Sequence, residues 1–178
     1  MVYAYTSVVG GNFLETDYEV LLRWGQFNSF VMKGWYWQLL TSIFVHVDVI
    51  HLFGNMFFLL IFGFRAEELF STEEFLLVYF LSGLCGNLLT LLLMHPLTLS
   101  AGASGAIFGT FGACVIYLRK TLGQSIMSAL VYSFFLLMMN AGMGVNILAH
   151  FGGLAAGLII GYALAKSRKI SVDTEYTM

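Results

Sequence analysis

The chain has 178 residues, of which 59% are hydrophobic and only 10% are charged, with a formal net charge of −2. A soluble domain carries about a quarter charged residues, so the composition excludes an ordinary soluble domain and predicts a single-domain membrane protein. The near-zero net charge indicates no nucleic-acid partner. Cys85 and Cys114 both lie in apolar stretches, which is typical of buried thiols and not of a disulfide or a metal pair.

Residues 11–45 form a long mixed region that contains all three tryptophans. Tryptophan concentrates at the membrane–water interface, so we expect a partly helical loop that lies on or in the outer leaflet. Five apolar segments follow, and most approach the ~20 residues that a spanning helix needs. They cover residues 49–64, 75–94, 104–118, 125–140 and 148–165. The sequence therefore predicts an all-α polytopic membrane protein with five transmembrane helices.

The basic residues predict the orientation of these segments. Most of them follow the first, third and fifth segments, at Arg65, Arg119, Lys120, Lys166, Arg168 and Lys169. Basic residues favour the cytoplasmic side, so these three segments should run in parallel from outside to inside and leave the C-terminus in the cytoplasm. Residues 1–48 then lie outside, although no export signal precedes them. We therefore expect a sixth spanning helix upstream, which residues 2–9 would end; a natural five-span protein is the alternative.

A single domain is expected over residues 1–178. It consists of an N-terminal segment and interfacial loop (1–48), a helical core (49–166) and a cytoplasmic tail (167–178). The last part of the tail, residues 170–178, is expected to be disordered.

Helix rise places several polar residues at similar depths in the membrane. Counted from the cytoplasmic basic residues, Ser104 lies ~22 Å, His150 ~24 Å and His51 ~21 Å up a hydrocarbon layer about 30 Å thick. Asn55 is one turn below His51 and shares its helix face. Polar groups at such depths are costly and tend to mark function. Because Ser104 begins its segment, free backbone N–H groups surround it, which completes the parts of an acyl-transfer site: nucleophile, base and donors.

Three motifs contain these residues. They are "GASGAIFG" over residues 102–109, "AHFGGLAAG" over residues 149–157, and the set His46, His51 and Asn55. The chain here resembles the rhomboid family of intramembrane serine proteases, whose motifs GxSGxxxG, AHxxGxxxG and HxxxxHxxxN these stretches match. The motifs occur in the family's order on alternate segments, and the resemblance covers nearly all of residues 35–165.

The resemblance implies a role for each polar residue. Ser104 would attack the scissile carbonyl, and His150 would take its proton and later pass it to the leaving amine. No acid lies within the spans to orient the histidine, so the pair would act as a dyad. The backbone N–H of Ser104 and the side chains of Asn55 and His51 would hold the oxyanion.

The resemblance also implies roles for the surroundings of the site. Gly102 and Ala103 would shape the loop that leads to the nucleophile. The segment at 125–140 and the loop "AGMGVN" at 141–146 would form the gate and cap for the substrate. Phe108 stands where the family often has tyrosine, and it would stack on the histidine without a hydroxyl group.

Two further departures from the family pattern are visible. Its Trp-Arg pair reads Trp37-Gln38 here, which weakens any role of that arginine in anchoring the loop but affects no catalytic group. The first family helix has no counterpart in the sequence, which puts stability in doubt more than chemistry.

Packing is the alternative interpretation for several of these residues. Ser104 alone is typical of a small residue at a helix contact, and His150 alone of a hydrogen bond between helices; together with His51 and Asn55 they favour catalysis. We interpret the ridge Gly153, Gly157 and Gly161 as close helix packing, with Gly105, Gly109 and Gly112 as the complementary surface. Structural rather than catalytic roles are expected for the other polar residues: His46 as a hydrogen bonder, Asp48 as a helix cap, Asn87 in a helix–helix bond, and Glu67, Glu68, Glu73 and Glu74 in a solvated turn.

Other functions are disfavoured by what the sequence lacks. It has no HExxH motif for a zinc protease, no pair of carboxylates in the spans for an aspartyl protease, and no lysine near Ser104 for a serine–lysine hydrolase. A transporter with a polar midplane site and an inactive rhomboid relative remain as rivals. We predict a serine endopeptidase without cofactor or metal, whose partners are transmembrane protein substrates and the lipid bilayer. Its site would open to the extracytoplasmic side of the cell membrane, and the sequence does not indicate an oligomeric state.

Overall fold

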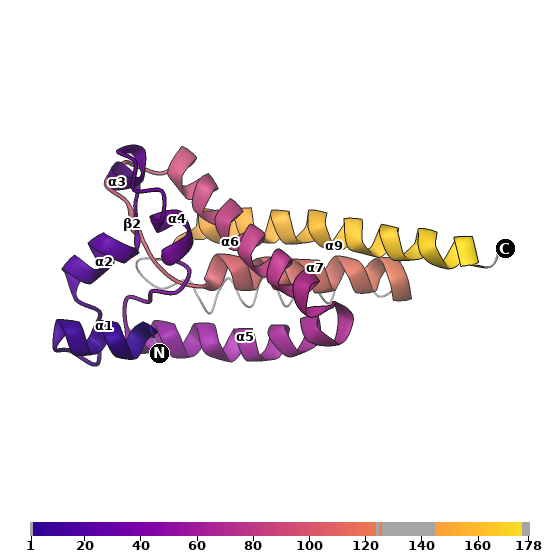
Figure 1. Ribbon diagram of the computed structural model, residues 1–178, viewed down its shortest axis with the longest axis horizontal. Coiled ribbons are helices and arrows are strands. Elements are labelled where there is room, and N and C mark those ends of the chain that lie inside the picture. The colour runs from indigo at the N-terminus through magenta and orange to yellow at the C-terminus, as the bar shows by residue number, and fades with distance from the viewer. Residues whose placement is uncertain (1, 124, 126–144, 176–178) are drawn as a thin grey trace.

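The computed structural model describes residues 2–123, 125 and 145–175 (Figure 1). Its elements are α1 (Val2–Gly10), α2 (Tyr18–Trp24), β1 (Gln26–Phe27), α3 (Asn28–Met32), α4 (Gln38–Thr41), α5 (Val49–Leu69), α6 (Thr72–Leu93), β2 (Leu99–Ser100), α7 (Ser104–Leu122) and α9 (Ile147–Glu175). The predicted fourth span falls almost wholly outside the described residues, as do residues 141–144 of the predicted gate loop.

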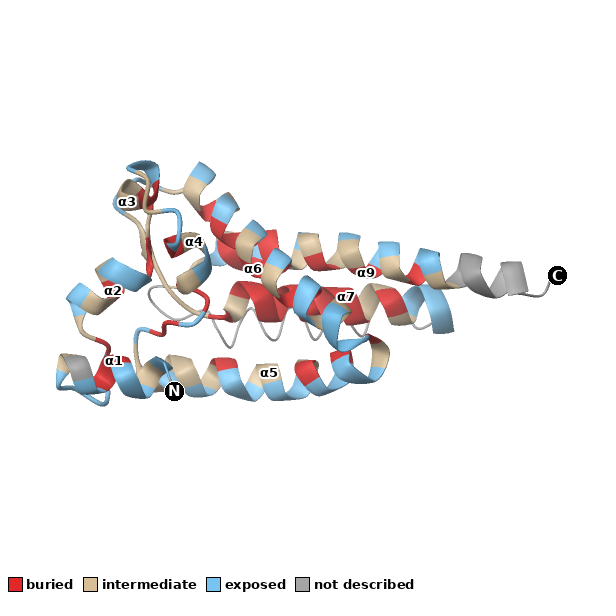
Figure 2. Ribbon diagram, in the orientation of Figure 1, coloured by how far each residue is buried: buried red, intermediate tan, exposed pale blue. Residues whose placement is uncertain are grey.

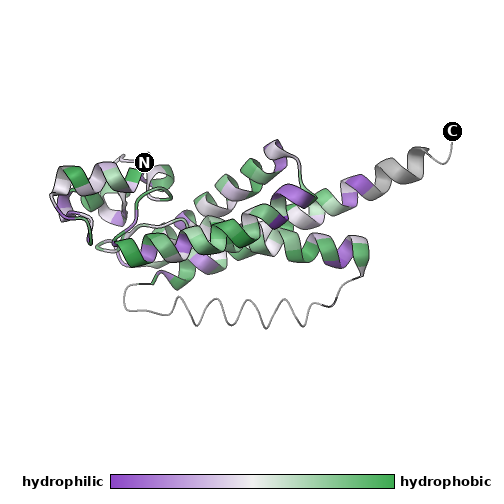
Figure 3. Cartoon of the chain, turned by 90° about the horizontal axis from the view of Figure 1, so that it is seen from below, coloured by the Kyte–Doolittle hydropathy of each residue, from purple (hydrophilic) through white to green (hydrophobic). Residues whose placement is uncertain are grey.

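Among the described residues, the long helices α5, α6, α7 and α9 form the body of the molecule, and the short helices α1–α4 gather at one end of it (Figure 1). Helices α5, α7 and α9 run in the same direction and α6 runs against them, which is the arrangement that the predicted topology requires. Three described helices are long and apolar enough to cross a membrane: α5, α6 and α9 over Ile147–Arg168. Apolar residues cover most of their length, as Figure 3 shows.

Helix α7, the predicted third span, is not one of those three apolar helices. Its glycines and its final Arg119 and Lys120 make it less hydrophobic than its neighbours. It is nevertheless the most deeply buried of the described helices, with every residue from Gly105 to Cys114 buried (Figure 2). A helix enclosed by protein needs no lipid-facing side chains, so its composition follows from its central position.

The spans end later than the apolar runs predict. Helix α5 continues past Arg65 to Leu69, and α9 continues through the predicted tail boundary at residue 167 to Glu175. The expectation of disorder from residue 170 is therefore wrong as far as Glu175. Hydropathy marks only the membrane-buried part of a helix, whereas backbone hydrogen bonds extend the helix into the polar region. The cap of α5 is as predicted, because the Asp48 carboxylate accepts from the His51 N–H at 2.6 Å.

Helices α7 and α9 approach each other so closely that their backbones touch. A methyl group added at Gly153 or Gly157 would overlap the backbone of Gly105 or Gly109, and one added at Gly161 would lie 2.5 Å from the Ala113 carbonyl oxygen. The predicted glycine packing is confirmed for the first two pairs. The third contact comes from Ala113, whereas Gly112 faces the Leu154 side chain and backbone. Small residues permit this distance, and van der Waals contact along the ridge stabilises it.

The loop before α5 is held by buried amide side chains. Gln38 is fully buried; its carbonyl accepts from the Phe27 N–H at 3.0 Å and its amide donates to the Leu22 carbonyl at 2.7 Å. Gln38 thus anchors the loop although it stands where the family has arginine, because a neutral amide satisfies two backbone groups without burying a charge.

Asn87 joins this loop to α6. It donates to the Leu39 carbonyl at 2.8 Å and to the Ser42 hydroxyl at 2.9 Å, so the predicted helix–helix bond is made to short helix α4 and to the residue that follows it. The sequence also did not reveal that β1 pairs with β2, which adds a two-stranded antiparallel sheet to a fold predicted as all-α.

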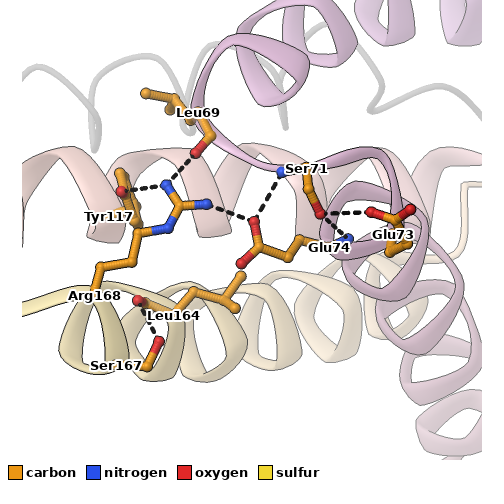
Figure 4. A network of polar contacts seen from close by, with 8 residues as sticks. All are labelled: Leu69, Ser71, Glu73, Glu74, Tyr117, Leu164, Ser167 and Arg168. Atoms are coloured by element: carbon orange, nitrogen blue, oxygen red, sulfur yellow. Dashed lines mark hydrogen bonds and ion pairs between the residues drawn. The ribbon is translucent and has the colours of Figure 1, made fainter. Parts of the chain in front are cut away.

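A cluster of charged and polar groups joins the helices at the end of the bundle that lies away from the short helices α1–α4 (Figure 4). The Arg168 guanidinium donates to the Leu69 carbonyl at 2.7 Å, the Tyr117 hydroxyl at 2.6 Å and the Glu74 carboxylate at 2.6 Å. Four elements therefore meet at one planar cation, which supplies donors in fixed directions. Glu74 is engaged here, so the predicted fully solvated turn is wrong for this residue.

We predict that Gly157→Ala destabilises the protein by roughly 1–3 kcal/mol, because the added methyl group pushes α9 away from the backbone of Gly109. Gly54→Ala on α5 is the matched control: within the described structure its added methyl group meets no atom within 4 Å. Removing glycine's backbone freedom there should instead stabilise the helix by about 0.5–1 kcal/mol. Thermal unfolding in detergent micelles measures both, and equal shifts for the two variants would contradict the close approach.

Candidate active site

Ser104 is the first residue of α7, and it lies beside the start of α9. Its Oγ atom is 2.8 Å from Nε2 of His150, which is a hydrogen-bonding distance between residues 46 positions apart. Ala103 precedes the helix and offers no side-chain acceptor to the first N–H groups of α7. These N–H groups lie beside the serine hydroxyl, which is the arrangement that stabilises an oxyanion.

The His150 ring is held by an aromatic partner. Phe108 stacks on it with ring centroids 4.4 Å apart and an angle of 18° between the planes. Both side chains are buried, with 3% and 4% of their surface exposed. Within the described part of the chain, Nδ1 of His150 is buried and has no hydrogen-bond partner. The ring is therefore oriented by stacking and by its contact with Ser104, and no carboxylate of the described residues holds its far side.

Asn55 and Ser104 face the same small pocket between α5 and α7. The pocket is lined by Asn55, Phe58, Phe62, Ser104, Ile107, Phe108 and Phe111. The Asn55 amide donates to the His51 carbonyl one turn earlier at 2.8 Å, while its Oδ1 is buried without a partner in the described structure. The bond to His51 uses one of the two amide hydrogens of Asn55, whose side chain lines a pocket with mostly apolar walls.

His51 is adjacent to the loop that leads to the nucleophile and does not line that pocket. A Cβ atom at Gly102 would lie 2.7 Å from Cε1 of the His51 ring, so only glycine fits against it. Gly102 also has φ +136°, a conformation that L-residues with side chains rarely adopt, and its N–H donates to the Ser42 carbonyl at 2.9 Å. The loop geometry and the ring position therefore depend on the same glycine.

His46 lies just outside the membrane-spanning part of α5, with its ring 5.4 Å from that of His51. Its backbone carbonyl accepts from the Thr16 hydroxyl at 2.6 Å, whereas neither ring nitrogen has a partner of good geometry among the described residues. The hydrogen bond expected of this residue is thus made by its backbone and not by its ring. Burial first, and the neighbouring His51 second, lower the pKa of His46 to about 4, while the Phe44 backbone and Asp48 act in the opposite direction.

We predict that the His46 ring makes the protein less stable in mild acid. Between pH ~6.5 and pH ~4, histidine in the unfolded chain is protonated while the buried ring of the folded protein stays neutral. The stability present above pH ~6.5 is therefore lost as the pH falls, by up to roughly 3 kcal/mol. Unfolding of His46→Gln in detergent between pH 4 and pH 7 should show a shallower pH dependence than the wild type. His95→Gln, at an exposed loop position, is the matched control. Equal slopes for wild type and His46→Gln would contradict the prediction.

One contributor to the site's surroundings was misplaced by sequence reasoning. Asn146, expected in the cap loop, accepts from the Ala149 N–H at 3.0 Å and so caps the start of α9. An asparagine immediately before a long apolar run is a helix N-cap signal, and it was present in the sequence. The described residues contain no group of three or more histidine, cysteine, aspartate or glutamate side chains that could hold a metal ion.

Comparison with known proteins agrees with this geometry. A model of the Rhomboid domain matches residues 33–167. RHOMBOID-like protein 6, mitochondrial, of Arabidopsis thaliana is 37% identical over 134 residues, which are 72% of this chain and 43% of that protein. Rhomboid-like protease 3 of Toxoplasma gondii is 36% identical over 135 residues, 70% of this chain and 50% of that one. Rhomboid protease GluP of Bacillus subtilis (strain 168) is 31% identical over 179 residues, 92% of this chain and 32% of that one.

The fold and the site define a helical integral membrane protein with a serine and a histidine in contact inside the bundle. The chain belongs to the rhomboid family. It spans half the length, or less, of these three relatives.

Proposed function

We propose that the chain is an intramembrane serine protease that hydrolyses peptide bonds in or near transmembrane helices, with Ser104 and His150 as a catalytic dyad. The observation that carries the proposal is the 2.8 Å contact between the Ser104 hydroxyl and the His150 ring at the start of a buried helix. The names of two relatives, rhomboid-like protease 3 and rhomboid protease GluP, support the same class of activity.

Attack by Ser104 begins the reaction. For the hydroxyl to donate to Nε2, the neutral His150 ring must carry its own proton on Nδ1. As Oγ bonds to the scissile carbonyl carbon, Nε2 takes the hydroxyl proton, and the carbonyl electrons move onto the oxygen to form a tetrahedral oxyanion. The backbone N–H of Ser104 and the amide of Asn55 are the donors for that oxyanion, with His51 beside them.

Release of the products reverses the proton transfers. The oxyanion collapses, the C–N bond breaks, and Nε2 returns its proton to the leaving amine nitrogen. A water molecule then attacks the acyl-enzyme, gives its proton to Nε2, and the second collapse restores the Ser104 hydroxyl. The stacked Phe108 ring keeps the imidazole in one orientation through both halves, the task that a carboxylate performs in a triad.

We predict that Ser104→Ala abolishes cleavage of a transmembrane substrate by the purified protein, and that His150→Ala lowers kcat by about 10²–10⁴-fold. A fluorophosphonate probe should label the wild type at Ser104 and should not label Ser104→Ala. Ser82→Ala is the matched control for the first variant, because it removes the hydroxyl of a serine that is fully buried in the neighbouring helix α6. Cleavage that survives Ser104→Ala would refute the nucleophile assignment, and solute flux that survives it would favour a transporter.

We also propose that the substrates are transmembrane proteins whose helices unwind easily near one end. The site lies where α5, α7 and α9 begin, at the end of the bundle opposite Arg65, Arg119 and Arg168. By the positive-inside rule the arginines lie on the cytoplasmic side, so we expect the site on the other side of the membrane. Only the outer end of a substrate helix can reach it, and the attacked bond must be extended and no longer helical.

Leucine substitutions in the outer end of a substrate helix should therefore slow cleavage, because they raise the cost of unwinding it. The same number of leucines in the cytoplasmic half is the control and should have little effect. Initial rates at equal substrate concentration measure the difference, and equal rates for the two substrates would contradict the model.

A further inference from the structure

Asn146 makes three side-chain hydrogen bonds at the start of α9. Its Oδ1 accepts from the Ala149 N–H at 3.0 Å, and its amide nitrogen donates to the Thr90 hydroxyl at 2.7 Å and to the Ser100 hydroxyl at 2.9 Å. One side chain thus joins α9 to α6 and to strand β2.

The orientation of the Asn146 amide follows from its partners. The Thr90 hydroxyl donates its proton to the Gly86 carbonyl at 2.9 Å, so its oxygen is left to accept from Asn146. Thr90 is fully buried, and its own carbonyl accepts from Asn28 at 3.2 Å. Thr90, which accepts a hydrogen bond from Asn146, is therefore itself held in place.

Asn146 and its partner Ser100 each precede one of the two reacting residues by the same number of positions. Ser100 lies four positions before Ser104, and Asn146 lies four positions before His150, whose N–H points to the Asn146 carbonyl at 3.3 Å. The Asn146–Ser100 hydrogen bond thus joins the two segments of chain that lead directly into the contact between Ser104 and His150.

On the C-terminal side of that contact, the backbones of α7 and α9 pack directly against each other at Gly105 and Gly153. On its N-terminal side, strand β2 is held by its pairing with β1, where Gln26 lies opposite Ser100. The serine–histidine contact is therefore bracketed by a glycine contact on one side and by the Asn146 bridge on the other.

We infer that Asn146 is a positioning residue that sets where His150 lies along the axis of α9 relative to Ser104. It does so by hydrogen-bonding the start of α9 to the strand that leads to the nucleophile. The inference rests on the proposed protease function. Asn146 touches neither reacting atom; it acts through the helix that it caps. Without the bridge, α9 can slide or tilt about the glycine contact, and a displacement of about 1 Å at a catalytic group can cost ~10²-fold in rate.

Two variants test the bridge from its two sides. Asn146→Ser keeps a side-chain oxygen that can cap the helix, but it is too short to reach Thr90 or Ser100. Ser100→Ala removes one acceptor and leaves Asn146 in place. Each variant should lower kcat and the rate of fluorophosphonate labelling by ~10–10²-fold with KM changed less than about twofold, and the double variant should lose little more than the worse single one.

Thr16→Val is the matched control. Thr16 is likewise a buried polar residue near the start of α5, and its hydroxyl donates to the His46 carbonyl at 2.6 Å, so this bond joins neither β2 nor α9. This variant should lower the unfolding temperature and leave kcat near the wild-type value. Losses of kcat that only follow the losses of unfolding temperature across all three variants, or fully additive losses in the double variant, would overturn the inference.

Ser104→Ala separates this inference from the proposed function. If that variant still cleaves, the protease mechanism fails whatever the bridge variants do. If it is inactive and Ser100→Ala retains wild-type kcat and labelling, the mechanism stands and the positioning role of Asn146 fails.

Discussion

The structure depends on the backbone contact between α7 and α9. Hydrocarbon offers little hydrophobic drive for one apolar helix to leave lipid for another, so close approach and dispersion must hold them together. Gly105 and Gly109 on one helix and Gly153 and Gly157 on the other allow that approach. The same contact determines the distance between the first turns of the two helices, where a serine and a histidine meet. Catalytic geometry here is a consequence of helix packing.

Polar residues in the loop before α5, at the same end of the bundle as this contact, solve a related problem. The loop before α5 leaves backbone groups that water cannot satisfy if the loop lies in the membrane. Buried amides do this work: Gln38 bonds the backbone of Phe27 and Leu22, and Asn87 bonds Leu39 and Ser42. Ser42 in turn accepts from Gly102. The loop and the nucleophile's approach are thus parts of one hydrogen-bonded layer, built from neutral groups whose burial costs less than that of a charge.

Sequence reasoning was most accurate where one physical constraint dominates. Apolar length predicted α5, α6 and the membrane part of α9, and glycine spacing predicted the α7–α9 contact at Gly105 and Gly109. It was less accurate where polar residues continue a helix, as beyond Arg65 and beyond residue 167. It also did not reveal the anchoring role of Gln38 and missed the pairing of β1 with β2, because a two-residue strand leaves no periodic pattern to recognise.

By itself the sequence determined that this chain is an apolar, polytopic helical protein, and that Ser104, His150, His51 and Asn55 lie at similar depths. Both follow from local quantities: hydrophobicity, motif spacing and the rise of a helix. Only the tertiary structure decided which of these side chains touch. It joined Ser104 to His150, turned His51 against Gly102, and brought Asn146 to Ser100. Such contacts depend on the rotation and tilt of each helix against its neighbours, and no single segment of sequence contains that information.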